Sequence, residues 1–298
     1  YLATTLISLY SKCGVMSKAQ QVLEEIPFRD VASWNALISG YTQQGQGHKA
    51  LNCFKQMQND GITPNMVTFI CILKACASTK AIEKGKQIHD DVANRGILEK
   101  DIVLGTALVD MYAKCGALEK ALEVLEETQV RNVFLWSALI AGYAQLGEFK
   151  IVFELFNKMM VGGVLPDVVT YLVLMSVCCH VGLIDEGQKV FDHMTTYNLS
   201  PNLEHYTCMV DLFGRAGDFN KAMHIIEKVP YSDCLPLFLV LLGACHKWAN
   251  VELGRWAFEQ SVMLEKNCAS AYVAIGNINA AAGLHVGADF TTMELEHG

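Results

Sequence analysis

Cysteine and histidine are the residues of this chain whose types could bind a metal ion. The chain has 11 cysteines and nine histidines, and they come closest together in Cys178-Cys179-His180 and Cys245-His246. Adjacent residues on a helix point about 100° apart, so these side chains cannot converge on one ion. No Cys-x-x-Cys spacing occurs in the chain, although zinc deaminases need such a pair with a His and a Glu. We therefore predict no metal site and no cofactor.

A second possible chemical motif is Gly45-Gln46-Gly47, which is similar to part of a phosphate-binding loop. Such loops follow a strand, whereas Gly45 lies between two apolar helical stretches and is better explained as a turn. The histidines show neither a His-Glu-x-x-His motif nor a placement beside a nucleophile. We predict no catalytic residue, and we expect that the chain is not an enzyme.

The strongest pattern is an internal repeat. When the sequence is aligned with itself at a shift of 102 residues, Lys12-Cys13-Gly14 matches Lys114-Cys115-Gly116, and Trp34 matches Trp136. Single glycines recur at intervals of 31 or 35 residues, or of 71 residues where two units separate them: Gly14, Gly45, Gly116, Gly147, Gly182 and Gly217. A unit of about 31–36 residues cannot bury its own apolar face and must stack on its neighbours. The pattern predicts an array of helical hairpins with one long groove.

Within the unit Val31 to Asn65 we predict two antiparallel helices. The first, over 31–43, has Trp34, Leu37, Ile38 and Tyr41 at helical spacing, and the second covers 48–59. The glycine at position 45 separates the two helices, and Gly61 and Pro64 end the second one.

Composition agrees with a continuous array. A chain of 298 residues would suggest about two domains, but the repeat runs to at least Asp233 without a Pro/Gly/Ser-rich linker. The cysteines recur at equivalent helical positions, as in Cys76, Cys178 and Cys245, which indicates buried thiols in a reducing compartment. The chain has no initiator Met and opens inside a repeat, so we expect it to be a fragment whose targeting segment lies upstream.

Several segments resemble the plant pentatricopeptide repeat (PPR) family. They are Asp30 to Ile38, Leu73-Lys74-Ala75-Cys76-Ala77, Gly85-Lys86-Gln87-Ile88-His89, and Pro166-Asp167 followed by Val168-Val169-Thr170-Tyr171. The rotation of short, canonical and long units resembles the family's PLS subclass. The resemblance implies an all-α, right-handed superhelical solenoid of helix-turn-helix repeats.

The resemblance divides the chain into seven repeats, a helical extension similar to the subclass's E type at 235–283, and an unassigned tail at 284–298. The repeats are S 1–30, P 31–65, L 66–101, S 102–132, P 133–167, L 168–202 and S 203–234. The extension is identified from Leu241 to Cys245, Asn250 to Gly254, Tyr272-Val273 and Ala280 to Gly283.

The family binds single-stranded RNA at about one base per repeat. The resemblance implies that two side chains of each repeat read the base, and we call the one on the first helix the first reader and the one at the end of the repeat the second reader. The pairs that imply a base are Thr4 with Asp30 (guanine), Asn35 with Asn65 (a pyrimidine), Thr106 with Asn132 (adenine) and Ser137 with Asp167 (guanine).

The long repeats have an apolar first reader, in Ile70 with Asp101 and Leu172 with Asn202, and should barely discriminate. In the seventh repeat, Thr207 is left with Asp233 or Cys234 as its partner. The implied RNA, read 5′ to 3′, is G-Y-N-A-G-N-N.

The formal net charge of −8 is unfavourable for binding RNA phosphates. Lys12, Lys114 and Arg215 precede the inter-helix turns at matching registers and could line the RNA backbone. Two functions follow as hypotheses. The first is a factor that selects cytidines for C-to-U editing in a plant organelle, the mitochondrion or alternatively the chloroplast, with the deaminase supplied by a partner protein. The alternative is a protein–protein interaction scaffold. No apolar run is long enough for a membrane span, and we expect no membrane partner.

Overall fold

The computed structural model describes residues 2–98, 101–128 and 132–283, and throughout these ranges the regular structure is helical, without a strand. The chain forms two compact units, Tyr1–Pro166 and Asp167–Gly298, and each is described by itself. Every helix of the described residues is too short or too polar to cross a lipid bilayer.

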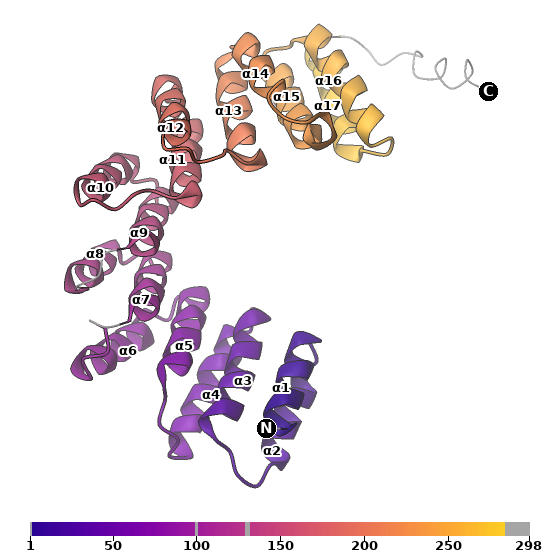
Figure 1. Cartoon of the computed structure of the whole chain (residues 1–298). Coiled ribbons are helices and arrows are strands. Elements are labelled where there is room, and N and C mark those ends of the chain that lie inside the picture. Colours follow the sequence, from indigo (N-terminus) through magenta and orange to yellow (C-terminus); the bar gives the residue numbers. More distant parts are fainter. Residues whose placement is uncertain (1, 99–100, 129–131, 284–298) are drawn as a thin grey trace. The chain divides into compact units, whose positions relative to one another are not determined.

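Unit 1 consists of five helical hairpins, and we call the two helices of each hairpin its first and second helix (Figure 1). The first helices are α1 (Leu2–Lys12), α3 (Val31–Gln43), α5 (Met66–Thr79), α7 (Ile102–Lys114) and α9 (Val133–Gln145). The second helices are α2 (Met16–Glu25), α4 (Gly47–Asn59), α6 (Ile82–Asn94), α8 (Leu118–Glu127) and α10 (Phe149–Val161).

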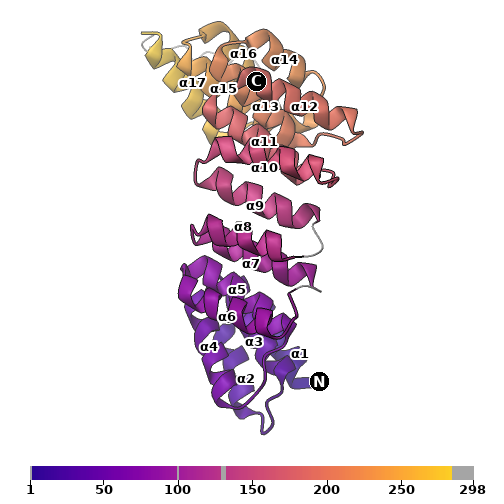
Figure 2. The ribbon, with the colours of Figure 1, turned by 90° about the vertical axis from the view of Figure 1, so that its left-hand side faces the viewer.

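The first helices of unit 1 form one layer, in which each packs on the next, from α1 to α9. Each of α2, α4, α6 and α8 contacts its own first helix and the first helix of the following hairpin. The second helices therefore cover one side of the first-helix layer, and Figure 2 views unit 1 from the side of α6, α8 and α10.

The hairpin of α3 and α4 shows why the sequence folds this way. Trp34, Leu37, Ile38 and Tyr41 lie on one side of α3 and are at most 3% exposed. Gly45 then adopts φ +69°, a left-handed conformation that favours glycine, and ends the helix. The predicted bounds of α3 are confirmed, and α4 begins one residue earlier than predicted.

Unit 2 continues with the hairpins α11–α12 and α13–α14, followed by three more helices. Their bounds are α11 (Val168–Val181), α12 (Ile184–Thr196), α13 (Leu203–Ala216), α14 (Phe219–Ile226), a 3-10 turn at Tyr231–Asp233, α15 (Leu235–Lys247), α16 (Val251–Leu264) and α17 (Ala269–Ala281). In this unit α11 packs on α13, α13 on α15, and α15 on α17, so the layer of first helices continues into the predicted extension.

The predicted all-α array of helix-turn-helix repeats is confirmed. The handedness of its superhelix, the repeat boundaries and the continuity of one array over 1–234 stay predictions. The predicted tail at 284–298 lies outside the described residues.

All 11 cysteines are free thiols, and most are buried as predicted. Burial raises the pKa of Cys76 to about 12 and the pKa of Cys245 to about 11. These thiols are therefore uncharged at neutral pH and act as small apolar groups in the helix packing. The prediction is wrong for Cys13, which is exposed because it lies between the end of α1 and Gly14.

Candidate nucleic-acid interface

The second readers from the first repeat to the sixth share one structural position: each is the N-cap of a first helix. They are Asp30 before α3, Asn65 before α5, Asp101 before α7, Asn132 before α9, Asp167 before α11 and Asn202 before α13. In each case a side-chain oxygen accepts a hydrogen bond from the backbone N–H three residues later, at 2.8 to 3.2 Å. A cap of this kind stabilises a helix by about 1 kcal/mol. It also fixes the direction of the side chain's remaining polar atoms.

The first readers lie on the first helices, about one turn after the cap. The hydroxyls of Thr106, Ser137 and Thr207 donate to the backbone carbonyl four residues earlier, at 2.8, 2.7 and 2.7 Å. The hydroxyl oxygens of Thr106 and Thr207 have a further lone pair that can accept a hydrogen bond. Ile70 and Leu172 are half-buried, and their side chains have no polar atom. Thr4 is half-buried on α1.

The structure brings the two readers of the second repeat into direct contact. The Asn35 amide Nδ2 donates to Asn65 Oδ1 at 3.0 Å. Sequence reasoning missed a third member of this group, Thr68, whose hydroxyl donates to Asn35 Oδ1 at 2.7 Å. The signal that could have found it is the spacing Asn65-x-x-Thr68, which is typical of a capping box, and the structure contains that box.

Replacing Thr68 with valine is expected to lower the free energy of unfolding by about 1–3 kcal/mol. The change removes the hydroxyl that donates to the amide oxygen of Asn35, and Asn35 is buried, with only 8% of its surface exposed. Valine has nearly the same volume, so the change tests the hydrogen bonds of the Thr68 hydroxyl rather than packing. Besides the bond to Asn35, this hydroxyl accepts from the Asn65 N–H at 3.1 Å and lies 3.1 Å from Asn65 Oδ1. Urea unfolding of the purified chain measures the loss. The matched control is Thr79→Val, since the Thr79 hydroxyl bonds only the Ala75 carbonyl of its own helix. Equal, small losses for both variants would contradict the network.

Exposed apolar side chains recur on the first helices and were also missed by sequence reasoning. Val67, Val103, Phe134 and Val169 are 52, 60, 61 and 53% exposed. Each lies three residues before a first reader, and residues at this spacing share one face of a helix. The first helices therefore present an apolar side chain beside each of these readers. The detectable signal was that these apolar residues recur at the repeat intervals, each at the same place three residues before a first reader.

The negative charge of the chain is distributed unevenly between the two kinds of helix. The first helices of unit 1 contain Lys12, Lys74 and Lys114 against one carboxylate, Asp110. The second helices of unit 1 together contain ten carboxylates and eight lysines. The carboxylate caps add negative charge to the first-helix ends.

Hydrogen bonds from the Ser33 backbone and hydroxyl lower the pKa of Asp30, which is therefore ionised and only accepts hydrogen bonds at neutral pH.

Two of the three predicted backbone-lining cations already have a carboxylate partner on their own helix. Lys114 Nζ lies 2.8 Å from Asp110 Oδ2, and Arg215 Nε lies 2.8 Å from Asp211 Oδ1. Such exposed pairs contribute little to stability, so an RNA phosphate can compete for the cation. Lys12 is exposed at the end of α1.

The cysteine and histidine clusters do not assemble a metal site: within the described ranges, no three His, Cys, Asp or Glu side chains come together as metal ligands would. The Cys179 thiol donates to Asp211 Oδ2 at 2.9 Å, and His180 Nδ1 lies 2.6 Å from the backbone carbonyl of Ser176. Both side chains therefore take part in ordinary helix contacts.

Two models of PPR repeats match the sequence. The model described as "PPR repeat family" matches residues 29–78 and 131–180, and the one described as "PPR repeat" matches 1–31, 106–133, 169–199 and 204–234. Together they cover more than half of the chain.

Curated relatives from Arabidopsis thaliana match nearly the whole chain. Pentatricopeptide repeat-containing protein At1g08070, chloroplastic, is 40% identical over 285 residues, which are 95% of this chain and 38% of the relative. Pentatricopeptide repeat-containing protein At2g03380, mitochondrial, is 36% identical over 284 residues, which are 95% of this chain and 41% of that protein. The chain thus spans less than half the length of these two proteins.

Solved structures share the fold. The pentatricopeptide repeat protein PPR10 in complex with an 18-nt psaJ RNA element matches with a TM-score of 0.71 at 20% identity, over 94% of this chain and 42% of that chain. The crystal structure of PPR10 from maize matches with a TM-score of 0.61 at 16% identity, over 98% of this chain and 53% of that chain.

Proposed function

Because the chain belongs to the pentatricopeptide repeat family, we propose that it binds single-stranded RNA and selects it by sequence. The solved relative PPR10 forms a complex with RNA. The observation on this chain that carries the proposal is the recurring pair on the first helices, an exposed apolar side chain three residues before a reader. An unstacked base can lie against the apolar side chain while its Watson–Crick edge reaches the reader.

The chemistry of the second readers supports selection among bases. An ionised carboxylate such as Asp30 only accepts hydrogen bonds, and it therefore suits the N–H groups on the Watson–Crick edge of guanine. An asparagine amide both donates and accepts, so Asn65 and Asn132 suit other edges. With the pairs assigned from the family, the proposed target remains G-Y-N-A-G-N-N.

The proposed biological role is selection of the RNA site for C-to-U modification in a plant organelle, with the deaminase supplied in trans. The chain is proposed to belong to the PLS subclass with an E-type extension, which corresponds to α15, α16 and α17. Relatives named chloroplastic and mitochondrial support an organelle, and we propose the mitochondrion, with the chloroplast as the alternative.

The proposal is tested by titrating the purified chain against a short RNA that contains G-C-A-A-G and against a scrambled RNA of equal composition, at two salt concentrations. A good base contact is worth about 1–3 kcal/mol, so we expect the matched RNA to bind at least about tenfold more tightly at both salt concentrations. Equal, negligible binding to both RNAs would overturn the proposal and favour a protein scaffold.

A further inference from the structure

The two readers of the second repeat and Thr68 form one hydrogen-bonded group, which joins α3 to the start of α5. Thr68 is fully buried, Asn35 is 8% exposed, and Asn65 is exposed. Asn65 is therefore the member of the group that a base can reach most easily, and the other two decide which of its atoms are still available.

The orientation of both amides follows from a backbone N–H, which only donates. The Thr68 N–H contacts the Asn65 side chain at 3.1 Å, so the atom that it contacts must be the oxygen Oδ1. The Asn35 atom 3.0 Å from this oxygen must then be the nitrogen Nδ2, and the Asn35 atom that receives the Thr68 hydroxyl at 2.7 Å is Oδ1. Reversing either amide would place two donors or two acceptors in contact.

The Thr68 hydroxyl has one proton, and its bond to Asn35 Oδ1 at 2.7 Å is shorter than its separation of 3.1 Å from Asn65 Oδ1. The proton therefore belongs to the bond with Asn35, while the hydroxyl oxygen accepts from the Asn65 N–H. Asn65 Oδ1 accepts from two N–H groups, one of Thr68 and one of Asn35. These two bonds use both lone pairs of that oxygen.

The contacts of Asn35 occupy the edge of its amide that has a donor and an acceptor side by side. The nitrogen and oxygen of an amide are about 2.2 Å apart, and the two atoms that they contact, Asn65 Oδ1 and Thr68 Oγ1, are 3.1 Å apart. Both contacts must therefore lie on the same edge. An amide with this edge occupied cannot match an adjacent N–H and carbonyl of a base.

The group that remains for a base is the Asn65 amide nitrogen, which has two N–H donors. Cytosine presents two adjacent acceptors, N3 and O2, on its Watson–Crick edge. In uracil an N3–H donor lies between two carbonyl oxygens. An amide N–H directed at position 3 of the ring is therefore attracted by cytosine and repelled by uracil.

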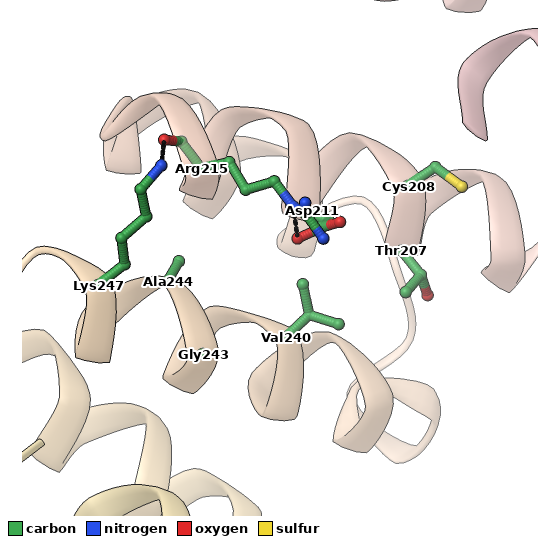
Figure 3. A pocket seen from close by; sticks show the side chains of 8 residues that line it. All are labelled: Thr207, Cys208, Asp211, Arg215, Val240, Gly243, Ala244 and Lys247. Atoms are coloured by element: carbon green, nitrogen blue, oxygen red, sulfur yellow. Dashed lines mark hydrogen bonds and ion pairs between the residues drawn. The ribbon is translucent and has the colours of Figure 1, made fainter. Parts of the chain in front are cut away.

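The residue that corresponds to Thr68 differs in other repeats. At the fourth repeat it is Leu135 and at the seventh it is Leu237, each three residues after an N-cap, and leucine has no hydroxyl. In the seventh repeat the first reader Thr207 instead lines a pocket between α13 and α15 (Figure 3). A change at Thr68 should therefore affect the second base and leave the fourth base unaffected.

We propose that Thr68, which is neither a first nor a second reader, is a positioning residue that makes the second repeat select cytosine over uracil. Its hydroxyl holds the Asn35 amide, the Asn35 amide holds the Asn65 oxygen, and the Asn65 nitrogen then donates to the base. This inference rests on the proposed RNA binding and narrows the target to G-C-N-A-G-N-N.

The first test needs no variant and compares G-C-A-A-G with G-U-A-A-G. The net contribution of one hydrogen bond corresponds to about 2- to 13-fold in affinity, and the cytosine RNA should bind more tightly by this factor. A third RNA has pyrimidin-2-one as its second base, which keeps N3 and O2 but lacks the amino group of cytosine. It should bind like the cytosine RNA, and binding like the uracil RNA would contradict the proposed donor.

The second test removes the hydroxyl. Thr68→Val should bind the cytosine and uracil RNAs equally, because the Asn35 amide can then turn and no longer fixes Asn65. Thr68→Ser keeps the hydroxyl and should retain the preference for cytosine, since Ser33 occupies the equivalent position in the capping box of α3. Each variant is titrated at a temperature at which circular dichroism shows it to be folded.

The matched control is Thr79→Val, because the Thr79 hydroxyl donates to the Ala75 carbonyl of its own helix. This control should keep the wild-type preference for cytosine. The preference for adenine over guanine at the fourth base, measured with G-C-A-G-G, should be the same in every variant. A general loss of folding would weaken both preferences, whereas a loss of positioning changes only the one at the second base.

The outcomes separate the two proposals. If the wild type prefers the matched RNA over the scrambled RNA but binds cytosine and uracil alike, or if Thr68→Val keeps the preference for cytosine, Thr68 does not position the reader and the proposed RNA binding stands. If the wild type shows no preference for the matched RNA, both proposals fail.

Discussion

Phe134→Ala is expected to weaken binding of the matched RNA by about 5- to 150-fold, because stacking of one base on an aromatic side chain is worth about 1–3 kcal/mol. Among Val67, Val103, Phe134 and Val169, the exposed apolar side chains that precede readers in the described part of the chain, Phe134 is the aromatic one, and it is 61% exposed on α9. Because this side chain is exposed, the change should alter the free energy of unfolding by less than about 0.5 kcal/mol, as surface substitutions usually do. Fluorescence anisotropy with a labelled RNA measures the effect.

The control for this prediction is Phe28→Ala. Phe28 is 91% exposed, and it lies between α2 and α3 rather than on a first helix. It should leave RNA affinity unchanged. A graded variant, Phe134→Val, should lose less affinity than the alanine variant, because valine occupies the equivalent position in Val67, Val103 and Val169. If Phe134→Ala and Phe28→Ala bind RNA alike, the exposed apolar residues do not contact bases.

The helices could be predicted from the sequence because their signals are local. The spacing of apolar residues predicted the bounds of α3, and the recurring glycines predicted the inter-helix turns. Gly182 and Gly217 illustrate the turns, with φ of +78° and +80°. Glycine is favoured at such a position because it adopts a positive φ without a steric cost. The glycine recurs in six of the seven predicted repeats, so each unit supported the interpretation of the others, and in the α5–α6 hairpin Lys80 takes the left-handed conformation in its place, with φ +57°.

The contacts of the candidate site were less predictable, because they join residues about one repeat apart. The Asn35 side chain donates to Asn65 Oδ1 and accepts from the Thr68 hydroxyl. Both hydrogen bonds depend on how α3 packs on α5. Helix capping and base reading are two different roles that the side chain of a second reader could have. In the structure the cap uses one oxygen of each side chain, such as Asn132 Oδ1. The other half of the side chain is a separate chemical group, so one residue has the atoms for both roles.

This division of atoms leads to the second large prediction. Asn132→Asp should change the preferred fourth base from adenine toward guanine, by about 1–3 kcal/mol or about 5- to 150-fold. The amide of Asn132 can donate to a base, whereas a carboxylate only accepts and suits guanine N–H groups. Asparagine and aspartate cap helices about equally well, so the bond from the Leu135 N–H should persist and α9 should keep its stability. An alanine at position 132 would also remove the helix cap, so its effect on base preference could not be separated from its effect on the stability of α9.

The chain offers a matched control in Asn202→Asp. Asn202 also caps a first helix, α13, through the His205 N–H, and its paired first reader is the apolar Leu172. The control therefore adds the same charge and preserves the same kind of cap, but it should leave the preference at every base unchanged. RNAs that contain G-C-A-A-G and G-C-A-G-G measure both variants. A shift in Asn132→Asp alone would assign base reading to the N-cap of α9, whereas equal profiles for the two variants would leave Asn132 with the capping role only.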